Sequence, residues 1–106
     1  MSYSPRIDYL EYDGKDGKVH QIDVKGDINS KRRKAMNLIK SGKVAKDAGV
    51  YQVRFGPDVK SEVNAGMSRP NALAYVPDKG FVYYSLWDFF NGEYLVKKDG
   101  SLGRRL

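Results

Sequence analysis

The feature that most constrains the fold is a doubled Asp-Gly turn near the start of the chain. It spans residues 13–17 and separates two segments, 7–12 and 19–25, in which apolar and polar residues alternate. Alternation with a period of two is typical of strands with one buried face, and Asp-Gly is a strong hairpin signal. The sequence therefore predicts a β-hairpin over residues 7–25.

One helical segment follows this hairpin. Ser30 is suited to be an N-cap and Gly42 to be a stop, which predicts an amphipathic helix over residues 31–41. We expect further strands at residues 50–55, 72–76, 81–86 and 93–96. This order predicts an α+β (mixed α/β) fold in which hairpin, helix, strand and second hairpin form one mixed sheet covered by helix.

The length of 106 residues suits a single domain over residues 1–106, with a core at about 6–96 and a loose tail at 97–106. No apolar run is long enough for a membrane helix and no signal peptide is recognisable, so we expect a cytoplasmic protein with no membrane partner. The chain has no cysteine and one histidine, His20, which excludes thiol catalysis and multi-histidine metal centres.

The net charge of +6 is concentrated in the middle of the chain. Residues 1–30 hold four basic and six acidic residues, residues 31–60 hold nine and two, and residues 61–106 hold six and five. Such a basic segment favours an anionic partner, most often nucleic acid, although a solvated helix face has the same composition. The residues expected to contact phosphates are Lys31, Arg32, Arg33, Lys34, Lys40 and Lys43.

The predicted hairpin carries acidic residues on both strands. On the second strand, alternation places Asp23 and Lys25 on one face together with Gln21. If the register brings Asp8 of the first strand across from them, two carboxylates beside an ammonium could hold a divalent cation for phosphodiester hydrolysis. The alternative is a hairpin with solvent-facing charges.

Residues 6–12, the glycine-containing turn and residues 20–25 resemble the core of the PD-(D/E)xK, or restriction-endonuclease-like, superfamily. Residues 71–86 are similar to the closing hairpin of its small homing-endonuclease-like and Holliday-junction-resolvase-like members. The resemblance implies a Mg²⁺ or Mn²⁺ ion held by Asp8 and Asp23, with Lys25 as the catalytic lysine and Gln21 assisting. The chain departs from the family in lacking the usual helix before the first strand.

These features predict a small Mg²⁺-dependent endonuclease that cleaves DNA at a junction, a nick or a specific site. The sequence favours DNA and leaves RNA open as the substrate. Two alternatives stay open. One is a non-catalytic, nuclease-derived nucleic-acid-binding or inhibitor protein of phage or mobile-element type, and the other is a metal-independent ribonuclease that uses His20. The sequence also leaves homodimerisation open. We expect a group of aromatic residues to close the core rather than stack on bases, namely Tyr75, Phe81, Tyr83, Tyr84, Trp87, Phe89 and Phe90.

Overall fold

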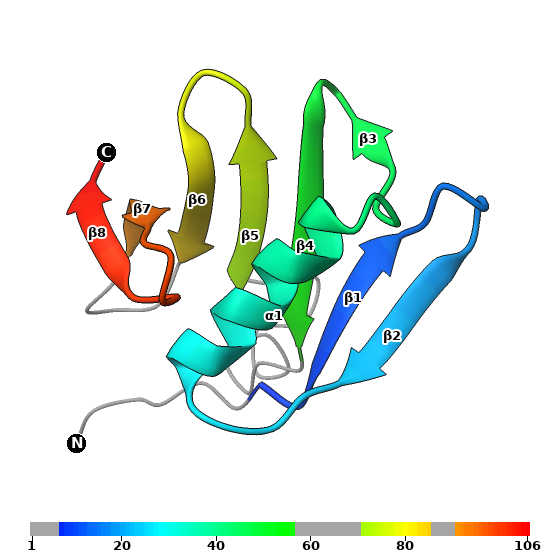
Figure 1. Cartoon of the computed structure of the whole chain (residues 1–106), viewed down its shortest axis with the longest axis horizontal. Helices are drawn as coiled ribbons and strands as arrows, with labels where there is room; N and C mark the ends of the chain where they lie inside the picture. Colours follow the sequence, from blue (N-terminus) through cyan, green and yellow to red (C-terminus); the bar gives the residue numbers. More distant parts are fainter. Residues whose placement is uncertain (1–6, 57–70, 86–90) are drawn as a thin grey trace.

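The computed structural model describes residues 7–56, 71–85 and 91–106 (Figure 1). Arg6 of the family resemblance and three of the aromatic residues, Trp87, Phe89 and Phe90, lie outside this part of the chain. The elements in chain order are β1 (Tyr9–Asp13), β2 (Val19–Asp23), α1 (Ile28–Lys40), β3 (Lys46–Asp47), β4 (Val50–Gly56), β5 (Asn71–Val76), β6 (Gly80–Ser85), β7 (Gly92–Val96) and β8 (Leu102–Arg105). The described residues contain one helix, α1. It is too short and too polar to cross a membrane.

The eight strands form one sheet in the order β2-β1-β4-β5-β6-β7-β8, with β3 beside β4. Every strand pair in the described residues is antiparallel, and one helix accompanies eight strands, so the expected α+β (mixed α/β) fold with a mixed sheet and a restriction-endonuclease-like core is wrong. The physical reason lies in the connections. Turns of two to five residues join β3 to β4, β5 to β6 and β7 to β8, whereas parallel neighbours need a crossover of about a dozen residues.

The first hairpin forms as predicted. β1 pairs with β2 from Tyr9 opposite Asp23 to Asp13 opposite Val19. Leu10 and Tyr12 are buried on one face, and α1 lies across this face of the sheet (Figure 1). The predicted hairpin is therefore confirmed, with one face of β1 in the core.

Helix α1 begins at Ile28, three residues before the expected start. Asp27, rather than Ser30, is the N-cap, because its carboxylate accepts a hydrogen bond of 2.8 Å from the backbone N–H of Ser30. The basic run 31–34 thus begins after the first turn, where the helix dipole has little effect on it. The helix ends at Lys40, and Gly42 follows with a φ of 82°.

The core lies between α1 and the sheet. Ala35, Met36 and Ile39 of α1 are buried against residues of the central strands, among them Phe55 and Leu73. The burial of such apolar surface is the main stabilising contribution in a domain of this size.

The expected loose tail is a strand instead. β8 pairs with β7 through Tyr94 opposite Arg105 and Val96 opposite Leu102. The β7–β8 turn contacts the N-terminal half of α1, where an Arg32 N–H group donates to the Gly100 carbonyl at 3.1 Å. Arg33 likewise donates to the Asp99 carbonyl at 2.8 Å. These bonds join residues more than sixty positions apart, so the local sequence pattern contained no sign of them.

Candidate nucleic-acid interface

The residues predicted to form a metal site lie on the first hairpin. Gln21, Asp23 and Lys25 are exposed, and Gln21 and Asp23 share a face of β2 as expected. The register, however, places Tyr9 opposite Asp23. Asp8 precedes β1, and its carbonyl accepts a 3.0 Å hydrogen bond from the backbone N–H of Val24. The sheet therefore lacks the register that would have set Asp8 directly across from Asp23.

The acidic residues that do share the face of Asp23 are Glu11 and Asp13 of β1. Arg54 of β4 lies against both, at 3.8 Å from Glu11 Oε2 and 3.4 Å from Asp13 Oδ2. Within residues 7–56, 71–85 and 91–106, no three His, Asp or Glu side chains are grouped so that they could hold a metal ion. The Mg²⁺ or Mn²⁺ ion that the resemblance implies therefore stays a prediction.

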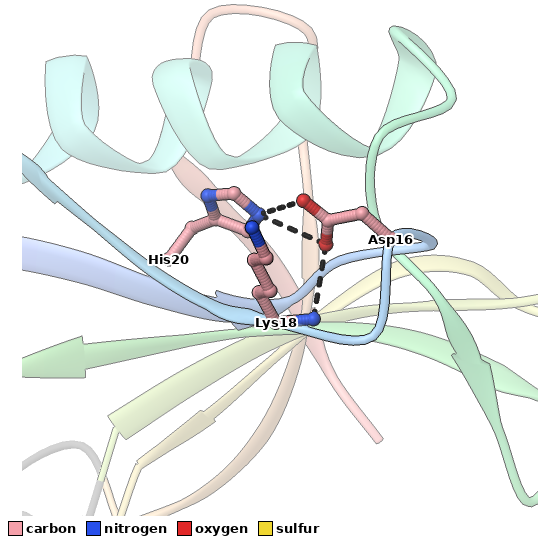
Figure 2. Close-up of polar contacts among 3 residues, drawn as sticks. All are labelled: Asp16, Lys18 and His20. Atoms are coloured by element: carbon pink, nitrogen blue, oxygen red, sulfur yellow. Dashed lines mark hydrogen bonds and ion pairs between the residues drawn. The ribbon is translucent and has the colours of Figure 1, made fainter.

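His20 has a partner that the sequence analysis did not foresee (Figure 2). Its Nε2 lies 2.9 Å and 3.1 Å from the two carboxylate oxygens of Asp16, and its ring stacks on Tyr12 with centroids 5.1 Å apart. The backbone N–H of Lys18 donates to Asp16 at 3.0 Å. This bond, followed by the contact with His20, lowers the pKa of Asp16 below its ordinary value. All these contacts close the β1–β2 turn, so the pair stabilises the hairpin.

Two of the six basic residues predicted to contact phosphates are used within the fold. The Lys31 ammonium donates to the Ile7 carbonyl at 2.6 Å. Arg32 is 7% exposed, and its guanidinium carbon lies 4.4 Å from the ring centroid of Tyr83. Burial lowers the pKa of Arg32, and the contact with Tyr83 opposes this shift. Arg32 is therefore buried in the fold and is not available to a ligand, whereas Lys31 is half-buried and donates one hydrogen bond within the fold.

Arg33 and Lys34 are exposed on α1, and Lys43 is exposed shortly after its end. They line an open groove of about 390 Å³ whose walls are Ser30, Arg33, Lys34, Asn37, Leu38, Ser41 and Lys43. The helical members are three or four residues apart, so they form one strip along α1. Arg33 is fixed at one end of this strip by its bonds to the Asp99 carbonyl and to Ser30 Oγ, each 2.8 Å long. We call this strip the helix groove.

A second cavity of about 370 Å³ lies beside the C-terminal end of α1, and we call it the aromatic cavity. It is lined by Lys15, Ile39, Lys40, Gly42, Tyr51, Tyr75 and Phe81. The register sets Tyr51 opposite Tyr75, and Tyr75 opposite Phe81, so the three rings form a row across β4, β5 and β6. Lys40 Nζ lies 5.7 Å from the ring centroid of Phe81. Lys40, which was predicted to contact phosphate, thus lies at the aromatic cavity.

The aromatic residues divide between the core and this cavity. Tyr83 is buried in the core, as expected, and Tyr84 lies on the opposite face of β6. Tyr75 and Phe81 are only half-buried and line the aromatic cavity. Tyr51 was not singled out in the sequence, because its place beside Tyr75 depends on the pairing of β4 with β5.

Within residues 38–43, Leu38, Ser41 and Lys43 line the helix groove, whereas Ile39, Lys40 and Gly42 line the aromatic cavity. Four of the six predicted basic residues line them, namely Arg33, Lys34, Lys40 and Lys43. The arrangement offers ammonium, guanidinium, hydroxyl and amide donors, which are the groups that contact phosphates in nucleic-acid complexes. No protein family, curated protein or solved structure matches this chain.

Proposed function

We propose that this protein binds nucleic acid through the helix groove. The observation that carries the proposal is the placement of Arg33, Lys34 and Lys43 along one strip of the protein surface. Ser30, Asn37 and Ser41 in the same strip add neutral hydrogen-bonding groups.

The electrostatics of the chain support this proposal. The basic residues of the strip belong to the segment 31–60, in which basic residues outnumber acidic ones by nine to two. Cations concentrated in this way displace the counterions around a phosphate backbone, and the release of these counterions favours binding at low salt. Arg33 is also held in place before any ligand arrives, which reduces the conformational entropy that binding would cost.

The first prediction concerns Lys34 and Lys43, which are exposed in the groove. We expect the double variant Lys34→Ala/Lys43→Ala to bind a fluorescent oligonucleotide about 10-fold more weakly than the unmodified protein at low salt. We also expect the slope of log Kd against log salt to be smaller by about 0.7 for each lysine that contacts a single strand. Fluorescence anisotropy from about 50 to 200 mM salt measures both quantities.

The matched control is Lys25→Ala/Arg104→Ala, which removes the same charge at two exposed positions outside the groove. It should keep most of the affinity. Equal weakening by the two double variants would show that only net charge matters and would refute the groove. Supercoiled DNA incubated with Mg²⁺ tests the nuclease prediction in parallel, and cleavage that is lost in Asp23→Ala would replace the present proposal.

A further inference from the structure

We infer that the aromatic cavity takes an unpaired base, so that the protein prefers single-stranded nucleic acid to a duplex. This inference rests on the proposed function and adds the class of ligand. It assigns the bases to the row Tyr51, Tyr75 and Phe81, and the phosphates to the lysines around it.

The geometry of the row suits stacking. Directly paired residues of neighbouring strands project from the same face of the sheet, about 5 Å apart. Tyr75 and Phe81 meet edge to face, with ring centroids 5.1 Å apart and an interplanar angle of 62°. All three residues are half-buried, and the volume of about 370 Å³ beside them falls within the range of small-ligand sites. An aromatic ring held in place by a sheet is a sequence-tolerant platform for a base.

Ammonium groups flank this row at both ends. Lys40 Nζ lies 5.7 Å from the centroid of Phe81, and Lys46 Nζ lies 5.7 Å from the centroid of Tyr51. Lys15 lines a further wall. A cavity that combines ring faces with several cations matches a nucleotide, which has a flat base and an anionic phosphate.

The position of the cavity extends the proposed interface. Residues 38–43 contribute to both the cavity and the helix groove. One strand could therefore place a base in the cavity and its neighbouring phosphates along α1. In a duplex the bases are stacked on one another and present only their edges in the grooves. The cavity therefore adds affinity only for a strand whose bases are unpaired.

The test compares two probes that share a backbone, an oligothymidine of about twelve nucleotides and an abasic strand of the same length. We expect the unmodified protein to bind the oligothymidine about 5- to 150-fold more tightly, which is the contribution of one stacked base. Tyr51→Leu/Phe81→Leu keeps apolar volume in the cavity but removes two rings, and it should abolish this preference. Tyr84→Leu removes a ring from the other face of β6 and should leave the preference unchanged.

The outcomes separate this inference from the proposed function. Equal binding of both probes by the unmodified protein would overturn the inference and leave groove binding intact. If neither probe nor a duplex bound at low salt, the proposed function itself would fail. A thermal melt of each variant shows that it is folded, and if the double variant unfolds, the single variant Tyr51→Leu, which should reduce the preference, replaces it. Thymidine monophosphate added as a competitor should displace the strand only weakly, and displacement at equal concentration would identify a free-nucleotide site instead.

Discussion

At the scale of single residues, the basic run 31–34 shows how neighbours can have opposite roles. Arg32 points into the fold, where neutral groups hold its guanidinium: Asn29 Oδ1 at 2.7 Å, the Gly100 carbonyl and the Tyr83 ring. Lys34, two residues later, is exposed in the helix groove. A helix places residues two apart on nearly opposite sides, so the outcome depends on the exact face that packs on the sheet.

Gly100 of the β7–β8 turn packs so closely against α1 that there is no room for a side chain. Its φ is 90°, and a Cβ there would overlap the Asn29 carbonyl and lie 2.9 Å from Arg33 Cγ. We expect Gly100→Ala to lower the free energy of unfolding by about 3 kcal/mol, because the turn must move away from α1 and leave Arg32 without one acceptor. Urea denaturation followed by circular dichroism measures this change.

Gly17 provides the control for Gly100→Ala. It has a similar φ of 81°, but a Cβ there would meet nothing within 4 Å. Gly17→Ala should therefore cost only about 1 kcal/mol, from the backbone conformation alone. Equal losses at the two positions would contradict the tight contact between the turn and the helix.

At the scale of elements, the sequence predicted the β1–β2 hairpin and the segment of the helix, because both follow from local patterns. It did not predict β3 or β8, since strands of two and four residues carry too few alternating positions. The helix start was also misplaced. Asp27 and Ser30 are both good N-cap residues. Asp27 is the N-cap in the structure, and Ile28, the first helical residue, packs against the core.

The Asp27 cap predicts a pH-dependent contribution to stability. The Ser30 backbone N–H and hydroxyl lower the pKa of Asp27 below its ordinary value of 3.8. A depressed carboxyl pKa stabilises the fold above the unfolded pKa, and this stabilisation is lost as the pH falls through the folded pKa. Asp27→Asn should retain a capping oxygen but lose this part of the dependence of stability on acid. Asp27→Ala should lower the denaturation midpoint both at neutral pH and in acid, because it has no capping oxygen.

Urea denaturation checks this prediction. The midpoints of the unmodified protein and both variants are measured at neutral pH and at a pH below the ordinary pKa of an aspartate side chain. Asp16 and Asp99 also have lowered pKa values, so the fold will lose stability in acid in every case. The difference between the unmodified protein and Asp27→Asn isolates Asp27. An unchanged difference on acidification would show that the cap does not titrate.

At the scale of the whole molecule, the sequence predicted a basic protein with one sheet but not the way the sheet is connected. The strand segments were recognisable, while their pairing depends on contacts such as Tyr51 with Tyr75 and Val53 with Leu73, which bring distant residues together. The basic residues predicted to contact phosphates also depend on the fold for their positions. Composition identified a basic segment, and only the fold shows that Arg32 is buried while Arg33, Lys34, Lys40 and Lys43 line the groove and the cavity.

Ligand binding should stabilise the whole fold if the interface is preformed. We expect oligothymidine in about 100-fold excess over its Kd to add about 2.7 kcal/mol to the free energy of unfolding and so to raise Tm. About 500 mM salt should remove most of this gain, because counterion release then contributes little. Differential scanning calorimetry at both salt concentrations measures the effect, and a rise in Tm that does not depend on salt would argue against phosphate contacts.

The length of α1 has a consequence for ligand size. Ser30 and Ser41 mark the ends of the helical strip and are eleven residues apart, which corresponds to about 16 Å along the helix axis. A strand stacked as in a duplex advances about 3.4 Å per phosphate along its axis, so this length matches at most about five phosphates, and fewer when the strand is more extended. On the proposed function, the length of α1 therefore limits how many phosphates one protein molecule contacts. A single nucleotide would leave most of the helix groove empty, and on a long strand each copy would cover only a short stretch and leave room for the next.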